Sequence, residues 1–235
     1  VRLALAGDIV PDAVNVSGGV IVEEVRPGLA LVEKLGRVFT QVAGGVPLHL
    51  HLEVSGEITE HDVSVWQLSA LKGLFLDVVE EQVSYVNAPV IAQARGVGVT
   101  LTTDPASGDF RNVTVLRGSL KDGTEFSVAG TLTGPRMIEK IVGINGFDLE
   151  VPLSDHMAVF TYPDRPGIIG QVGSILGETG INIGGMQVAR SLSQGSQGAA
   201  GSALMILTVD SEITHEIVAT IGTAIGATHT AVVNL

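Results

Sequence analysis

Apolar residues recur at intervals of three and four residues along three stretches of the first half of the chain, which predicts three helices. The first helix begins at Pro27 and ends at Gly44-Gly45, and its apolar face carries Leu29, Val32, Leu35, Phe39 and Val42. The second runs from Glu60 to Glu81, with Trp66 and Phe75 as core residues. The third covers residues 86–96, with Asn87 as its cap and Gly96 at its end.

Alternation of apolar and polar residues predicts the strands. Residues 48–54 alternate strictly, and further strands are expected at 97–103, 112–120, 124–133 and 137–144. Lys121-Asp122-Gly123 predicts a tight turn that joins two of them into an antiparallel hairpin, and Asn145-Gly146 predicts another turn. The order is a helix, a strand, two helices and then four strands. This order indicates an α+β domain with helices on one face of a sheet.

After a linker at Glu150–Asp155, the order of elements changes. A strand at 156–162 precedes a helix from about Gly167 to Gly177, a strand that starts near 181, a Ser/Gly/Gln-rich loop at 191–201, a strand at 203–209, a helix at 213–225 and a last strand at 228–235. This βαββαβ order predicts a ferredoxin-like domain, in which two helices cover one face of a four-stranded antiparallel sheet.

Charge and composition exclude several classes of function. The net charge of −12 argues against a nucleic-acid or anionic-membrane partner. Without cysteine there is no disulfide framework, and no apolar run is long enough to cross a bilayer, so a cytoplasmic location is expected. The chain also lacks a dinucleotide fingerprint, a P-loop and a catalytic triad, so we expect no catalytic residues and no cofactor in it. Its start at Val1 suggests a piece of a longer protein.

The stretch from Tyr162 to Asn182 carries the most distinctive polar groups. Tyr162, Asp164, the backbone at Gly167 and Ile168, and Asn182 are expected to surround a polar mouth at a helix N-terminus. The helix terminus suits a carboxylate and Asp164 suits an ammonium group, so the mouth suits a small zwitterion. The alternative is a simple turn followed by a core helix.

Asp164-Arg165-Pro166-Gly167 followed by Gly180-Ile181-Asn182-Ile183 resembles the ACT domain, which binds amino acids and regulates metabolic enzymes, in its D-3-phosphoglycerate dehydrogenase version. The resemblance implies that L-serine, a feedback inhibitor, bridges two ACT domains of a homo-oligomer. It places the effector at Tyr162, Asp164, Gly167, Ile168, Asn182 and Ile183.

Gly130-Thr-Leu-Thr-Gly and Lys140-Ile-Val-Gly-Ile-Asn-Gly resemble the intervening domain of the long-form, actinobacterial-type members of that family. Val-Pro-Asp-Ala-Val-Asn-Val at 10–16 resembles the end of their catalytic region. The resemblance therefore implies a catalytic tail at 1–20, an intervening domain at 21–150 and an ACT domain at 151–235, with NAD bound only by a catalytic part outside the chain. Members of the family can bind anions in the intervening domain through basic residues, but the Arg-His pair that follows the turn in their sequences is missing after Gly146. Arg136 and Lys140 then form either a weak anion site or part of a solvent-exposed sheet edge.

Three alternatives stay open. The chain could be a stand-alone amino-acid-binding module, or the regulatory part of a serine dehydratase. His49, His51 and Glu53 share one face of a strand, which is either a solvated face or a metal-dependent site.

Overall fold

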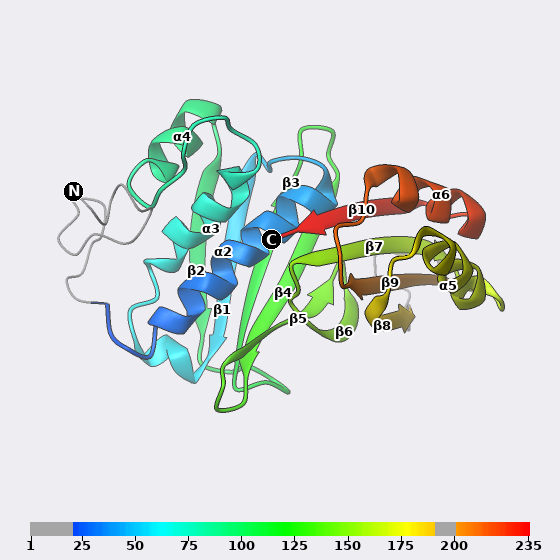
Figure 1. The fold of residues 1–235 in the computed structure, drawn as a ribbon. Coiled ribbons are helices and arrows are strands. Elements are labelled where there is room, and N and C mark those ends of the chain that lie inside the picture. The colour runs from blue at the N-terminus through cyan, green and yellow to red at the C-terminus, as the bar shows by residue number, and fades with distance from the viewer. Residues whose placement is uncertain (1–20, 191–200) are drawn as a thin grey trace. The chain divides into compact units, whose positions relative to one another are not determined.

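The computed structural model describes residues 21–190 and 201–235, and the chain divides into two compact units, Val1–Lys140 and Ile141–Leu235 (Figure 1). The predicted catalytic tail at 1–20 and most of the predicted loop at 191–201 lie outside the described residues. Each unit is described by itself.

From residue 21 onward, the first unit contains four helical segments. They are α2 (Arg26–Ala43), the short 3₁₀ helix η1 (Glu57–Glu60), α3 (Trp66–Leu76) and α4 (Ala88–Arg95). As predicted, α2 has proline in its first turn and ends at Gly44, whose φ of 73° closes the helix in the left-handed region. Trp66 is buried, and its indole N–H donates to the carbonyl of Val25 at 3.0 Å, so it is a core residue as expected.

Two details of the predicted helices are wrong. The stretch from Glu60 to Glu81 is helical only from Trp66 to Leu76, because Asp62 first forms a local turn by accepting a hydrogen bond from the amide of Ser64 at 2.9 Å. Asn87 precedes α4 but does not cap it with its side chain. Its Oδ1 accepts instead from the backbone and hydroxyl of Ser84, at 2.7 and 3.0 Å.

The strands of the first sheet are β1 (His49–Gly56), β2 (Gly98–Asp104), β3 (Asn112–Ser119), β4 (Glu125–Thr133), β5 (Ile138–Ile144) and β6 (Phe147–Pro152), in the order β2-β1-β3-β4-β5-β6. The boundary between the units falls within β5. β1 pairs parallel with β2 and antiparallel with β3, and β3 and β4 form the predicted hairpin. The predicted turn at Gly123, with a φ of 84°, joins the hairpin's strands.

Helices α2 and α3 cover one face of strands β1 to β4, as expected for this α+β layer (Figure 1). Leu50, Leu52 and Val54 of β1 are fully buried beneath them. The opposite face of β1 carries His49, His51 and Glu53, which are exposed or half-buried. The predicted alternation is thus confirmed, although Leu48, just before the strand, is exposed.

Strand β6 is missing from the sequence prediction, which treated Glu150–Asp155 as a linker. Glu150 and Pro152 belong to this strand, and its residues alternate between buried and exposed from Phe147 onwards. The Asn145-Gly146 turn was predicted correctly, with φ values of 49° and 79°. It joins β5 to β6, so the linker is shorter than expected.

The second unit has the predicted βαββαβ order. Its elements are β7 (His156–Pro163), α5 (Ile168–Thr179), β8 (Ile183–Arg190), β9 (Ser202–Val209), α6 (His215–Ile225) and β10 (His229–Asn234). The four strands are antiparallel in the order β10-β7-β9-β8. Apolar residues of α5 and α6, among them Val172 and Ile221, pack against Phe160 and Met205 of the sheet in one core. This is the ferredoxin-like arrangement, with β8 at an edge.

No helix in the described part of the chain has both the length and the apolar character needed to span a membrane.

Candidate functional site

A cavity of about 710 Å³ opens in the second unit, where β7 ends, α5 begins and β8 ends. Its walls come from the β5–β6 turn and β6, from the segment between β7 and α5 with the first turn of that helix, and from the last residues of β8. The lining residues are Gly146, Asp148, Tyr162, Asp164, Arg165, Pro166, Gly167, Ile168, Ile169, Gly170, Val188, Ala189 and Arg190. Four of the six residues predicted for the effector site are therefore together here.

Tyr162 reaches the cavity because it is almost the last residue of a central strand. It lies opposite Ala203 of β9, and its ring is part of the hydrophobic core with 2% of its surface exposed. The backbone then leaves the sheet, held by a hydrogen bond from the amide of Asp164 to the carbonyl of Gly201 at 2.8 Å. This places the Asp164 carboxylate on the cavity wall beside the tyrosine.

The N-terminus of α5 forms a further wall. Gly167 occupies the N-cap position with a φ of 92°, in a backbone region that favours glycine, and it provides no side chain to cap the helix. The amide of Gln171 bonds back to the carbonyl of Gly167 at 3.1 Å. No side chain caps this helix start, and a helix N-terminus favours a carboxylate through its first amides and its dipole.

The sequence prediction missed Arg190 as a residue of this site. Its Nε lies 2.8 Å from Oδ2 of Asp164, so the two form an ion pair across the cavity mouth. A second arginine, Arg165, also lines the cavity, and its guanidinium donates to the carbonyl of Ile225 at 3.4 Å. The cavity thus combines acidic and basic side chains, as a site for a zwitterion requires.

Burial raises the pKa of the Tyr162 hydroxyl above its usual value, and the nearby Asp164 carboxylate raises it further, while Arg190 acts in the opposite direction. Tyr162 is therefore neutral at physiological pH and keeps its hydroxyl proton. It can donate a hydrogen bond to a ligand and can also accept one.

Asn182 and Ile183 do not line this cavity. They lie where β8 begins, whereas Arg190 lies where it ends, and the seven residue steps between Ile183 and Arg190 correspond to about 20 Å along a strand. The backbone of Asn182 instead contacts Asp210, through one hydrogen bond in each direction at 3.3 Å. The expectation that Asn182 lies close to the loop before the helix is therefore wrong within a single copy of the chain.

The other predicted sites are less well formed. Arg136 is exposed in the turn before β5, and Lys140 is half-buried on that strand. Neither lines the cavity. On β1, His49 and His51 both contact the hydroxyl of Thr100, at 3.0 and 2.9 Å. Among the described residues no group of three or more His, Asp or Glu side chains could hold a metal ion.

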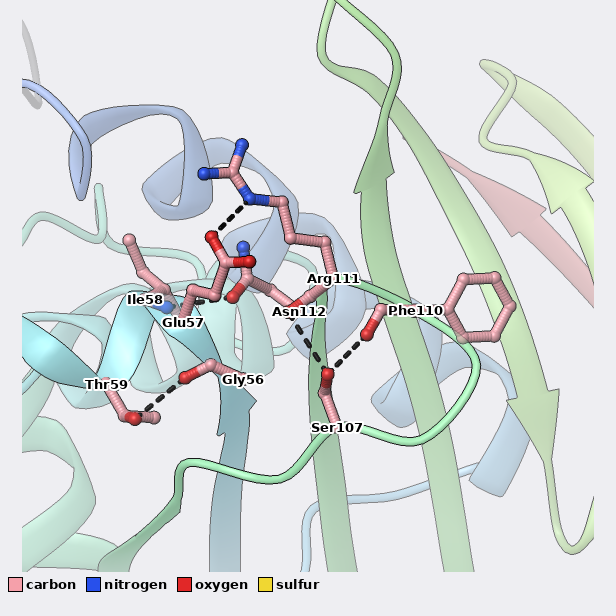
Figure 2. Close-up of polar contacts among 8 residues, drawn as sticks. All are labelled: Gly56, Glu57, Ile58, Thr59, Ser107, Phe110, Arg111 and Asn112. Carbon is pink, nitrogen blue, oxygen red and sulfur yellow. Dashed lines mark hydrogen bonds and ion pairs between the residues drawn. The ribbon is translucent and has the colours of Figure 1, made fainter.

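A second cavity, of about 530 Å³, lies in the first unit near the start of β3 and the end of β4. Two contacts join neighbouring segments at one side of this cavity (Figure 2). The Nε of Arg111 lies 2.7 Å from Oε2 of Glu57, and Oδ1 of Asn112 accepts a hydrogen bond from the amide of Ile58 at 2.8 Å. Gly56, with a φ of 109°, allows this close approach, since a side-chain carbon there would lie 2.1 Å from the carbonyl oxygen of Arg111. These contacts hold the segment that follows β1 against the start of β3 at one side of this cavity.

Two family models match the chain. The D-3-phosphoglycerate dehydrogenase intervening domain matches residues 24–145, and the ACT domain matches residues 156–226. These matches confirm the resemblance inferred from the Gly130 and Lys140 segments and from the Asp164-Arg165-Pro166-Gly167 motif.

Curated relatives with the name D-3-phosphoglycerate dehydrogenase agree with the models. The proteins from Mycobacterium leprae and Mycobacterium tuberculosis are 41% and 40% identical to the chain over its whole length. The protein from Synechocystis is 34% identical over 89% of the chain, which covers 37% of that protein. The chain spans 43% of the length of each mycobacterial relative. The chain therefore belongs to the family of the D-3-phosphoglycerate dehydrogenase intervening domain, which is followed here by an ACT domain.

Proposed function

We propose that the chain is the part of a D-3-phosphoglycerate dehydrogenase that binds L-serine in its ACT domain and transmits feedback inhibition. The observation that carries the proposal is the cavity beside the N-terminus of α5. It brings the Asp164 carboxylate, the Tyr162 hydroxyl and uncapped helix amides together. These groups match the ammonium, hydroxyl and carboxylate of serine one for one.

The cavity is completed by a second copy of the chain. Strand β8 is at the edge of its sheet, and an edge strand can pair with a strand of another chain. If two β8 strands pair antiparallel about a two-fold axis, the end of one strand lies beside the start of the other. Arg190 and Asp164 of one copy then lie near Asn182 and Ile183 of its partner, so all six predicted residues meet at the contact.

The contact with β6 is compatible with this pairing. Strand β6 lies against β8, and the amide of Glu150 donates to the side-chain oxygen of Gln187 at 3.0 Å, so this hydrogen bond is made to a side chain of β8. A homo-oligomer that buries β8 is therefore part of the proposal.

The remaining parts of the proposal follow the family. The intervening domain covers 21–150 and the ACT domain covers 151–235, and the intervening domain relays serine binding to a catalytic part. NAD binds in that catalytic part, and the assembly works in the cytoplasm. A coupling of about 1–3 kcal/mol between effector and catalytic sites is typical of such regulation.

Calorimetric titration of the purified chain tests the proposal. L-Serine should bind with a measurable heat, and L-alanine should bind more weakly than its small difference in size suggests. A site that hydrogen-bonds a hydroxyl group is left with unpaired polar atoms when that hydroxyl is absent. Absence of heat from L-serine at millimolar concentration would refute the proposal.

A further inference from the structure

The Asp164 carboxylate already has a cationic partner before any ligand arrives. Arg190 lies 26 positions later in the sequence, and the end of β8 brings its guanidinium to 2.8 Å from Oδ2 of Asp164. The side chain of Asp164 is 31% exposed and that of Arg190 is 70% exposed. The pair therefore lies at the mouth of the cavity, where a ligand has to enter.

An incoming ammonium group needs the same carboxylate. A carboxylate can accept from more than one donor, but two positive charges that share it repel each other and one of them gives way. The guanidinium has a long flexible side chain and high exposure, so it is the group that can move out into water. Binding of an amino acid is then an exchange of one cation for another at Asp164.

The carboxylate of the ligand has its own partner in the helix terminus. Gly167 leaves the first amides of α5 without a side-chain cap, and those amides line the same cavity. The Nε of Arg190 lies 2.8 Å from Oδ2 of Asp164, the carboxylate that is proposed to bind the ammonium group. The charge of Arg190 therefore acts mainly on the ammonium end of the ligand.

We propose that Arg190 is a built-in competitor for the ammonium group of the ligand at Asp164 and thereby lowers the affinity of the cavity for α-amino acids. This inference rests on the proposed amino-acid-binding function. It identifies Arg190 as a residue that sets the effector concentration to which the chain responds.

Titration of L-serine into three forms of the whole chain tests the inference: the wild type, Arg190→Met and Arg117→Met. Methionine keeps much of the length of the side chain and removes its charge. Exposed ion pairs are weak, so Arg190→Met should bind L-serine about 1.5- to fivefold more tightly than the wild type. Arg117 is the matched control, because it forms an exposed ion pair with Glu53 at 3.8 Å in the first unit. Arg117→Met changes the net charge equally and should leave the affinity unchanged.

Salt dependence separates competition from a structural role. Dissolved ions shorten the range of charge interactions from about 10 Å at 0.1 M to about 3 Å at 1 M. The affinity difference between Arg190→Met and the wild type should therefore shrink as salt is added. A second variant, Arg190→Lys, retains the positive charge and should bind more like the wild type than Arg190→Met does.

The possible outcomes are distinct. If the wild type binds L-serine and Arg190→Met binds equally or more weakly, the inference is wrong and the proposed function stands. If neither form binds L-serine, the proposed function fails and the inference fails with it. Tighter binding by Arg190→Met alone, with a difference that diminishes in salt, supports both.

Discussion

Tyr162 should make the stability of the second unit depend on alkaline pH. Its pKa is raised by burial and by Asp164, so the folded state holds the hydroxyl proton more tightly than the unfolded state. The resulting stabilisation is fully present below about pH 10, the usual tyrosine pKa, and is lost as pH rises through the higher folded value.

Urea unfolding at pH 9 and pH 11 measures this effect. The loss of stability between the two pH values should be smaller in Tyr162→Phe, which keeps the ring and removes the titrating group. Tyr85→Phe is the control. That residue's hydroxyl donates to Glu33 at 3.2 Å in the first unit, so its replacement retains the contribution of Tyr162. Equal pH dependence in wild type and Tyr162→Phe would contradict the prediction.

Asn182 should matter for the ligand and not for the fold. Its side chain is exposed, so Asn182→Ala should leave ligand-free thermal unfolding nearly unchanged. The Asn182 amide is proposed to form a hydrogen bond with serine across the contact between two copies. Removal of that hydrogen bond should reduce the free energy of binding by about 1–3 kcal/mol, which weakens binding roughly 5- to 150-fold. The stabilisation by added serine should then diminish accordingly.

The control for this experiment is Gln93→Ala, which removes an exposed amide from α4 in the first unit. It should bind serine like the wild type. Unchanged binding by Asn182→Ala would place the effector site elsewhere.

Sequence reasoning found the part of the site that is local in the chain. Tyr162, Asp164, Gly167 and Ile168 are separated by at most six positions, and a strand, a turn and a helix start bring them together. Arg190 could not be found in this way, because only the antiparallel pairing of β8 and β9 brings it back to Asp164. Asn182 was placed wrongly for the same reason, since the direction of β8 carries it to the opposite end of the sheet.

Helices α2 and α3 approach each other closely because glycines face the contact. A side-chain carbon added at Gly73 would lie 1.9 Å from the carbonyl oxygen of Glu33, and one added at Gly36 would lie 2.6 Å from the carbonyl oxygen of Ala70. Because these neighbours are backbone atoms, the helices must separate to admit a methyl group. Gly73→Ala should therefore destabilise the first unit by about 1–3 kcal/mol.

Gly177→Ala is the matched control. This glycine is also in a helix, α5, and a side-chain carbon there would have nothing within 4 Å. Alanine is favoured over glycine in helices by roughly 0.5–1 kcal/mol, so Gly177→Ala should stabilise the protein slightly. Chemical unfolding of both variants measures the two effects, and a stabilising Gly73→Ala would contradict the close-packing argument.

The helices and strands themselves were largely predictable, because apolar residues recur clearly at three- and four-residue intervals in the helices and at every second residue in the strands. Strand β6 was missed although Phe147, Leu149 and Val151 alternate with polar residues, because Pro152 was read as part of a linker. The helix α3 was predicted too long because apolar residues continue past Leu76. Val78 is 37% exposed and lies beyond the helix end. Apolar periodicity shows which residues are compatible with a helix, whereas local turns such as that of Asp62 determine where it begins.

At the scale of the whole molecule, the separation of Asp164 and Asn182 is itself an argument for assembly. A single copy offers the ligand an acid, a hydroxyl and helix amides but leaves the predicted amide at the opposite end of β8. Pairing of two β8 edge strands about a two-fold axis would unite them. We therefore expect a homo-oligomer in solution, and a monomeric mass both with and without L-serine would contradict the shared site.

Mixing two defective variants tests the shared site directly. Asp164→Asn and Asn182→Ala should each bind L-serine weakly when alone, because each pure dimer carries the same lesion in both of its sites. A mixed dimer is different. One of its two sites contains both substituted residues. The other site contains the unaltered Asp164 of one chain and the unaltered Asn182 of the other chain. After equal amounts are unfolded and refolded together, about half of the dimers are mixed, so about a quarter of all sites should bind with wild-type affinity. If each site were contained in a single copy, mixing would restore none.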